Sequence, residues 1–265
     1  MNAWLEVPRG WLDSFGEIAR FGSRIAGLVY SGRVLRFFGE SLRQAGILIL
    51  GSALIVWAFI FILGLQCGLI GAYFSRSIGA PGNAGLFSAY CDLREGLPYA
   101  FGYILSAKVG TGIVAELGAM RISDEIDALE VMGIPPVTFL AATRLLGAWI
   151  AIPFLYLVGI GVGYFASYIA VVEQVGDVSS GGYLLIFWTF QTPLDILFSL
   201  TKAMVMATII VCVGCYFGYT ASGGPVGVGT ATARSMAVNI ILVNIVGMLG
   251  TLAFYGSNPR APIGG

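Results

Sequence analysis

The sequence contains no histidine and few charged residues. Only 11% of its 265 residues are Asp, Glu, Lys or Arg, compared with roughly 25% in soluble proteins, and 57% are hydrophobic. Charges are absent from four long runs, residues 44–75, 145–172, 203–233 and 235–259. Each run exceeds the ~20 apolar residues that cross a bilayer, whereas a membrane β-barrel would show alternating segments of ~10 residues. The sequence therefore predicts an all-α membrane protein.

Several functional motifs are also missing. No G-x-x-x-x-G-K-[ST] occurs, so the chain cannot bind ATP through a P-loop. The glycine-rich residues 222–229 follow no predicted strand and lack the phosphate-binding spacing, which favours a cytoplasmic turn. Cys212 and Cys215 have C-x-x-C spacing inside a charge-free run with no second pair, which favours small packing residues over a metal or redox site. No catalytic residue and no metal site is predicted.

Five membrane-spanning helices are predicted, at about 45–74, 93–117, 138–172, 184–219 and 235–256. The second is the least clean, because it contains Lys108 and starts near Arg94 and Glu95. Together residues 45–256 form the predicted membrane domain. Residues 257–265 form an extracytoplasmic tail.

Residues 1–44 are predicted to form a cytoplasmic N-terminus with an amphipathic helix. Apolar residues share one face of that helix, and Arg20 and Arg24 lie away from it; the apolar residues are Trp11, Phe15, Ile18, Gly22 and Ile25. Such a helix favours the lipid headgroup region. A loosely structured basic tail is the alternative. The segment has no long apolar core, so it is not expected to be a secretory signal.

The arginines predict the orientation. With the N-terminus inside, the cytoplasmic set is Arg9, Arg20, Arg24, Arg33, Arg36, Arg43, Arg121, Arg144 and Arg234. The outside set is Arg76, Arg94 and Arg260. Because basic residues are enriched in cytoplasmic loops, this bias supports a cytoplasmic N-terminus and an extracytoplasmic C-terminus.

Acidic residues gather in one short segment between the second and third spans. ELGAMRISDEIDALEVMGIPP, residues 116–136, contains five of the 14 acids, namely Glu116, Asp124, Glu125, Asp127 and Glu130. Ser123 is a predicted N-cap, and Gly133 followed by Pro135 and Pro136 is a stop signal. The result is a short helix over 122–133, apolar on one face and acidic on the other.

Two interpretations of this acidic helix are open. It is either an interfacial helix kept wet by its charges or a docking element for a basic groove of a partner protein. Acids contribute little to topology, and anionic headgroups repel them. Docking is therefore favoured, through Ser123, Asp124, Glu125, Asp127 and Glu130.

The residues AELGAMRISDEIDALEVMGIPP, followed by Arg144 after the next apolar onset, closely resemble the signature of the MlaE/YrbE permease family. Members are membrane subunits of ABC transporters that work with MCE-domain proteins. Further similar positions are Gly64-Leu65-Gln66, Leu93-Arg94-Glu95, Lys202 and Phe217-Gly218-Tyr219. The resemblance covers about residues 10–256 and is greatest to actinobacterial YrbE of the B kind, which pairs with an A-kind subunit.

The resemblance implies that residues 122–133 are the coupling helix held by a separate ATPase subunit, which carries the ATP and Mg²⁺. It also implies that Gln66, Arg94 and Glu95 line a lipid cavity. The family pattern usually reads L-R-E-L-G-P, whereas here Gly96-Leu97-Pro98 follow Glu95, so the direction of Glu95 stays open. The alternative for Arg94 and Glu95 is an adjacent ion pair at a helix entry.

Three charges are predicted to lie at membrane depth, where each costs about 2.5–3.5 kcal/mol on insertion scales and therefore faces a partner or a cavity. Asp195 and Lys202 are seven residues apart, on the same side of one helix. A structural cluster of Lys108, Asp195 and Lys202 is predicted to join the second and fourth spans.

The predicted function is a permease subunit of an ABC transporter in the bacterial plasma membrane. The resemblance implies hydrophobic lipid cargo (fatty acid, mycolate, sterol or phospholipid), import, MCE proteins, ATPase subunits and a second permease subunit; no nucleic acid is expected. An intramembrane lipid-modifying enzyme is disfavoured because histidine, Ser/Lys and paired-carboxylate sites are missing. A passive scaffold or channel is the other alternative, although no ring-forming polar filter is visible.

Overall fold

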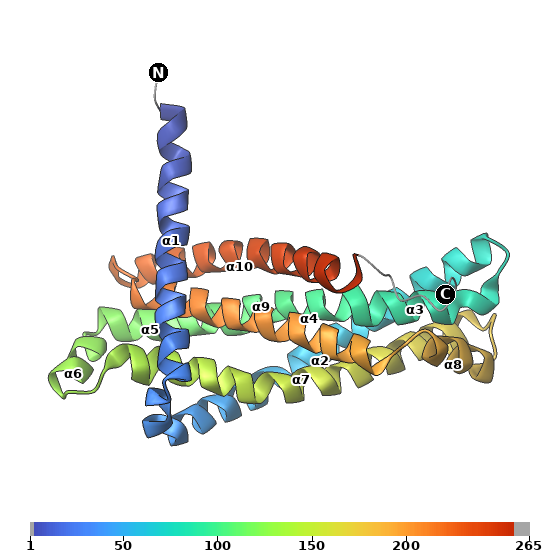
Figure 1. Cartoon of the computed structure of the whole chain (residues 1–265), viewed down its shortest axis with the longest axis horizontal. Helices are drawn as coiled ribbons and strands as arrows, with labels where there is room; N and C mark the ends of the chain where they lie inside the picture. Colours follow the sequence, from blue (N-terminus) through green and yellow to red (C-terminus); the bar gives the residue numbers. More distant parts are fainter. Residues whose placement is uncertain (1–2, 257–265) are drawn as a thin grey trace. The chain divides into compact units, whose positions relative to one another are not determined.

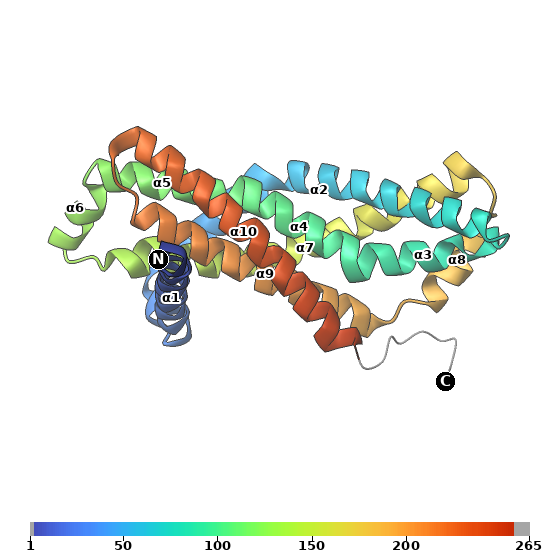
Figure 2. The same cartoon turned by 90° about the horizontal axis from the view of Figure 1, so that it is seen from above.

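The computed structural model describes residues 3–256, with side chains from residue 16 onward, and all its regular elements are helical (Figures 1 and 2). No strand occurs in this described range, which confirms the all-α prediction. The α-helices are α1 Ala3–Tyr30, α2 Phe38–Ser77, α3 Ala84–Tyr90, α4 Leu97–Leu105, α5 Thr111–Ile122, α6 Glu125–Val131, α7 Thr143–Tyr168, α8 Ser180–Thr189, α9 Pro193–Tyr219 and α10 Gly224–Tyr255. Two short 3-10 helices are η1 Arg33–Phe37 and η2 Pro81–Asn83.

Two long helical stretches contain π-helical turns, where the backbone widens. These turns are η3 Cys91–Gly96, η4 Ser106–Gly110, η5 Val137–Ala142 and η6 Ile169–Val175. With them, residues 81–122 and 137–175 each form one continuous helical stretch. Because π-turns redirect side chains and often occur at functional sites, η3 and η5 are of particular interest.

Five helical stretches are long and apolar enough to cross a membrane. They are Arg33–Ser77, Pro81–Ile122, Val137–Val175, Pro193–Tyr219 and Gly224–Tyr255, as the sequence predicts in number and order. The chain is therefore a multi-pass membrane protein.

Four predicted span starts are wrong. The first and second helical stretches begin at Arg33 and Pro81 rather than near 45 and 93. The fourth span begins at Pro193 rather than near 184, because the backbone is not helical just before this proline and residues 180–189 form the separate helix α8. The fifth begins at Gly224 rather than 235. Gly223 and Gly224 have positive φ angles of 87° and 68°, which turn the chain sharply, and Pro225 then fits the first turn of α10. Most of the predicted glycine-rich loop is therefore helical.

The chain packs as two compact units. Unit 1 comprises Met1–Leu48, Ser106–Ile150 and Thr208–Asn239. Unit 2 comprises Ile49–Leu105, Ala151–Ala207 and Ile240–Gly265. The boundaries fall inside α2, α7, α9 and α10, so each of these helices contributes to both units.

In unit 1, α1 runs across the neighbouring segments of α7 and α9 (Figure 1). Ile18 and Ile25 are buried, whereas Arg20 and Arg24 are exposed, which confirms the predicted amphipathic pattern for this part of the helix. Gly22 lies against Cys212. A Cβ placed at Gly22 would lie 3.6 Å from the Cβ of Cys212. The side chains of Trp11 and Phe15, and the predicted tail 257–265, lie outside the described residues.

In unit 2, α2 and α7 pack closely because glycine allows it. A Cβ at Gly64 would lie 2.4 Å from the backbone oxygen of Gly163, too close for any other residue. The core also contains Tyr156, whose hydroxyl lies 2.5 Å from that of Ser199, and Ser199 donates to the carbonyl of Leu93 at 2.6 Å. These contacts join α7, α9 and η3.

Candidate functional site

The acidic segment of unit 1 forms the short helix α6, Glu125–Val131, narrower than the predicted 122–133. The prediction that Ser123 is its N-cap is wrong. Ser123 instead caps the C-terminal end of α5. Its hydroxyl donates to the carbonyl of Ala119, four residues earlier in α5, at 3.0 Å. Asp124 occupies the N-cap position with a φ of 59°, a left-handed conformation that a short polar side chain tolerates. Glu125 and Asp127 still lie in the first turn, where the helix dipole favours them.

The end of α6 is fixed by its glycine, as predicted. Gly133 has a φ of 75° and donates to the carbonyl of Glu130 at 2.9 Å, and Ile134 donates to that of Leu129 at 3.0 Å. This pair of bonds is a Schellman motif. Pro135 and Pro136 follow, and η5 then begins the next span. The helix is therefore held at both ends by backbone geometry.

One residue anchors α6 in unit 1, and its outer surface is mixed. Ile126 is 1% exposed, whereas Val131 is 90% exposed and Met132 66%. Asp124, Glu125 and Glu130 are exposed, as predicted. Asp127 is exposed too, but it pairs with Arg121 at 2.6 Å. The available surface thus combines exposed carboxylates with an apolar tip.

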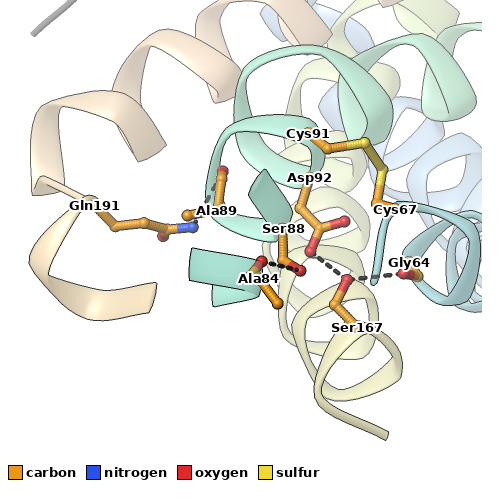
Figure 3. Close-up of a disulfide and its surroundings, with 9 residues drawn as sticks. All are labelled: Gly64, Cys67, Ala84, Ser88, Ala89, Cys91, Asp92, Ser167 and Gln191. Atoms are coloured by element: carbon orange, nitrogen blue, oxygen red, sulfur yellow. Dashed lines mark hydrogen bonds between the residues drawn. A yellow bond between two sulfur atoms is a disulfide. The ribbon is translucent and has the colours of Figure 1, made fainter. Parts of the chain in front are cut away.

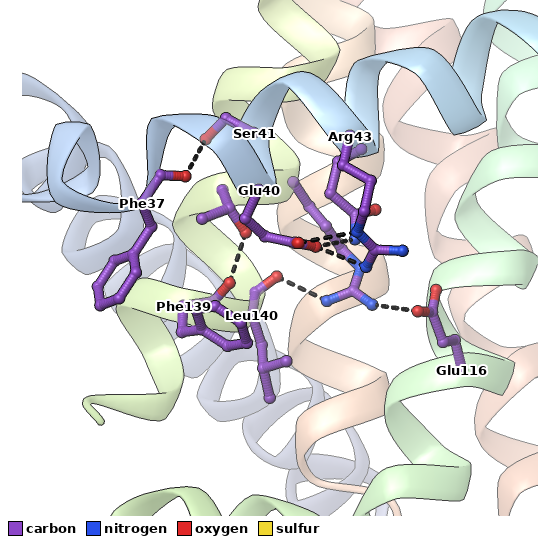
Figure 4. Close-up of polar contacts among 10 residues, drawn as sticks. Phe37, Glu40, Ser41, Arg43, Glu116, Phe139 and Leu140 are labelled. Atoms are coloured by element: carbon purple, nitrogen blue, oxygen red, sulfur yellow. Dashed lines mark hydrogen bonds and ion pairs between the residues drawn. The ribbon is translucent and has the colours of Figure 1, made fainter. Parts of the chain in front are cut away.

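Glu116 belongs to the same acidic stretch but has a different role. Its carboxylate lies 2.7 Å from the guanidinium of Arg144, whose side chain is only 5% exposed (Figure 4). Arg144 also donates to the carbonyl of Leu140 at 2.7 Å. Nearby, Glu40 pairs with Arg43 at 2.7 Å. These four charged residues lie on α2, α5 and the start of α7. Sequence reasoning singled out Glu116 and Arg144 but missed their pairing.

A second polar site lies in unit 2, where η3 faces α9. Arg94 lies 3.6 Å from the carboxylate of Asp195, and both side chains are nearly buried. The guanidinium lies over the rings of Tyr90 and Tyr255, at 4.1 and 4.4 Å from their centroids, where cation–π attraction adds to the ion pair. The other oxygen of Asp195 accepts from the backbone and hydroxyl of Thr192, which fixes the start of α9.

The next residue along η3 binds the buried lysine of α9. Glu95 lies 3.6 Å from Lys202, whose ammonium also donates to the carbonyl of Arg94 at 2.6 Å and to Thr251 at 2.8 Å. Thr251 in turn donates to Glu95 at 2.5 Å. Lys202 is buried, but 43% of the Glu95 side chain is exposed. Glu95 therefore presents part of a negative charge at the surface of the single chain.

These contacts correct two predictions. Asp195 and Lys202 join the second and fourth spans, but their partners are Arg94 and Glu95. Lys108 is exposed, and within residues 16–256 no ion pair includes it. Arg94 and Glu95 also do not pair with each other: as neighbours they face different α9 residues. The third predicted cavity residue, Gln66, is exposed.

A disulfide joins Cys67 of α2 to Cys91 of η3 (Figure 3). Beside it, the buried Asp92 lies 2.5 Å from the hydroxyl of Ser167, which also donates to the carbonyl of Gly64 at 2.8 Å. No residue of the described chain hydrogen-bonds the second oxygen of Asp92. Sequence reasoning assigned no role to Cys67, Cys91 or Asp92. The usable signal was the position of both cysteines near the same predicted extracytoplasmic connector.

Comparison with known proteins decides the family. The sequence model of the family described as Permease MlaE matches residues 41–253. The chain belongs to the MlaE permease family. The match covers all five spans, α6 and both polar sites, so membership rests on the whole membrane domain of this MlaE-family permease and supports a transport subunit rather than an enzyme.

Individual relatives agree. A probable ABC transporter permease of Rickettsia prowazekii is 33% identical over 162 residues, 61% of this chain and 62% of the relative. The chain thus matches less than two thirds of that relative's length. The intermembrane phospholipid transport system permease protein MlaE of Haemophilus influenzae is 24% identical over 93% of this chain and 95% of the relative. The chloroplastic protein trigalactosyldiacylglycerol 1 of Arabidopsis thaliana is 27% identical over 81% of this chain and 59% of the relative.

Proposed function

We propose that this chain is the membrane-spanning subunit of an ABC transporter that moves hydrophobic lipids, driven by a separate ATPase. The observation that carries the proposal is α6: a short helix fixed at both ends, with exposed carboxylates and the exposed Val131 and Met132, in a sequence that lacks a P-loop. A surface of this kind suits a partner groove that supplies basic residues at its rim and an apolar pocket. The Rickettsia relative, a probable ABC transporter permease, supports such a partner.

The proposed orientation places the N-terminus and α6 in the cytoplasm and the C-terminus outside, in a bacterial plasma membrane. The arginine distribution supports it. The disulfide supports it independently, because Cys67 and Cys91 flank the first connector and disulfides persist in oxidising compartments. ATP and Mg²⁺ are bound by the ATPase in this proposal.

The proposed cargo is a lipid. The Haemophilus relative is described as a permease of a phospholipid transport system, which supports lipid cargo here, and the resemblance to actinobacterial members favours import. We propose that Glu95, Arg94 and Gln66 contribute to the lipid-binding surface. Glu95 is suited to this role because it is half-exposed while its charge is fixed by Lys202. A second, A-kind permease subunit and MCE proteins complete the proposed assembly.

The experiment is purification of the tagged chain from its native membrane, with identification of co-purifying proteins and lipids. A P-loop ATPase and lipid are expected in the complex, and ATP should change the amount of bound lipid. Lipid chemistry by the isolated chain, without ATP and without an ATPase partner, would contradict the proposal.

A further inference from the structure

Two adjoining hollows lie in unit 1 where α1 turns into η1, at the lower end of α1 in Figure 1. Their volumes are about 680 and 450 Å³, and they share Leu28, Ser31, Arg33, Pro135 and Thr138. The end of α1 and η1 form one wall. Residues 133–138, which follow α6, form the other.

Positive charge dominates the smaller hollow. Arg33 and Arg36 line it together with the hydroxyl-bearing Ser31 and Thr138, and no carboxylate is among its lining residues. Arg24 and Glu130 line only the larger hollow. Among residues whose side chains are described, no salt bridge involves Arg33 or Arg36. Two unpaired guanidinium groups beside one hollow favour a phosphate or carboxylate ligand.

Exposed apolar side chains also occur at the start of the first span, on the side of the helix away from Arg33 and Arg36, and none of them lines either hollow. Leu35 is 61% exposed, Phe38 44% and Leu42 48%, at spacings of three and four residues that place them on one helical face. Tyr30, 81% exposed, lies at the end of α1, and tyrosine favours the membrane interface. Because the hollow lies at the start of a membrane span, the phosphates nearest to Arg33 and Arg36 are those of lipid headgroups.

We propose that the smaller hollow binds the phosphate of an anionic glycerophospholipid from the surrounding leaflet. Arg33 and Arg36 contact the phosphate, the larger hollow receives the rest of the headgroup, and the acyl chains extend into the surrounding leaflet. This lipid is distinct from transported cargo, and the site does not depend on the proposed transport function. Because its walls are α1 and residues 133–138, a bound lipid would fix the segment that carries α6.

The test uses the full chain in nanodiscs of phosphatidylcholine with a small fraction of photoactivatable phosphatidylglycerol. Crosslinking to residues 24–42 and 133–138 is mapped by mass spectrometry. Arg33→Gln with Arg36→Gln should lower this crosslinking about tenfold or more, because each arginine near an anionic surface contributes about one tenfold step or slightly less. Arg33→Lys with Arg36→Lys, which keeps the charge, should retain more crosslinking than the Gln variant.

The matched control is Arg20→Gln with Arg234→Gln, which removes the same charge from exposed arginines of unit 1 that line neither hollow. It should crosslink like the unmodified chain. An equal loss in the control would show a general surface attraction and overturn the proposal, as would a Lys variant that falls to the Gln level. Inorganic phosphate that abolishes crosslinking, when chloride of equal ionic strength does not, would assign the hollow to a free anion and also overturn it.

Discussion

The half-exposed carboxylate of Glu116 lies 2.7 Å from the guanidinium of Arg144, whose side chain is only 5% exposed. The pair joins α5, which leads to α6, to the start of α7, which follows it. Both helices that flank the acidic segment are therefore linked by one ion pair. A buried arginine that loses the carboxylate it contacts is costly, whereas an exposed carboxylate that loses its arginine returns to water.

Glu116→Gln should lower thermal stability in detergent by a few °C. The expected cost is about 1–2 kcal/mol, less than the 3–5 kcal/mol for breaking a fully buried pair, because Glu116 is half-exposed. Glu173→Gln is the matched control, because it removes the same charge from an exposed residue of η6. Equal melting temperatures of the two variants would show that the Glu116–Arg144 pair contributes no stability.

The apolar tip of α6 gives a second prediction. Val131→Asp with Met132→Asp should greatly reduce ATPase co-purification while the chain stays folded, because both side chains are exposed in the single chain and only a partner can bury them. Val226→Asp, at a position 79% exposed in unit 1, is the control. Pull-down of the ATPase measures the effect. Unchanged recovery with the α6 variant would remove Val131 and Met132 from the docking surface.

The carboxylates of α6 should act differently from one another. Glu125→Lys with Glu130→Lys is expected to slow ATPase association and to weaken the salt dependence of binding, because both charges are exposed. Asp127→Asn should have a smaller effect than Glu130→Gln, a single variant that removes the same charge, since Asp127 already pairs with Arg121 at 2.6 Å. Association rates at several salt concentrations would separate the two single variants. Similar rates for both would mean that the ion pair with Arg121 does not shield Asp127.

The site in unit 2 predicts non-additive mutations. Lys202→Met removes the ammonium that balances Glu95, and Glu95→Gln leaves a buried lysine without its carboxylate. The double variant should therefore be more stable than the sum of the single effects by about 1–3 kcal/mol. Thermal melting of the four proteins completes the cycle. Additive effects would show that the two residues do not interact across their 3.6 Å separation.

Sequence reasoning predicted the elements that depend on local pattern. Four charge-free runs predicted four of the five spans, and Gly133 with Pro135 and Pro136 predicted the end of α6. It failed where tertiary packing chose between equivalent local options. Serine is a favoured N-cap residue, but the hydroxyl of Ser123 bonds back to the carbonyl of Ala119 at the end of α5. Lys108 was grouped with Asp195 because all intramembrane charges look alike along the chain, and only the widened turn η3 shows that Arg94 and Glu95 face α9.

The disulfide could not be assigned from four cysteines alone, and it predicts a redox effect. Reduction, or Cys67→Ser with Cys91→Ser, should lower the melting temperature, because a crosslink across 24 residues stabilises by about 2–4 kcal/mol. Cys212→Ser with Cys215→Ser, at the two free cysteines, is the control and should leave the effect of reductant unchanged. Thermal melting with and without reductant measures both. If reductant still lowered the melting temperature of the Cys67/Cys91 variant, the effect of reductant would not come from this disulfide.

Asp92 supplies the last prediction, through the hydrogen-bond inventory of Ser167. The single hydroxyl proton of Ser167 can serve only one of its two acceptors at a time, the carbonyl of Gly64 at 2.8 Å and the carboxyl of Asp92 at 2.5 Å. Asn at position 92 has the same size and keeps a side-chain oxygen that can accept from Ser167, so Asp92→Asn should melt within about 2 °C of the unmodified chain. Ser167→Ala removes a partner of both Asp92 and Gly64 and should cost about 1–3 kcal/mol. Ser235→Ala, at a buried serine of unit 1 whose hydroxyl has no hydrogen-bond partner among the described residues, is the control and should cost less. If Asp92→Asn were instead as destabilising as Ser167→Ala, an amide at position 92 would not replace the carboxyl in its contact with Ser167.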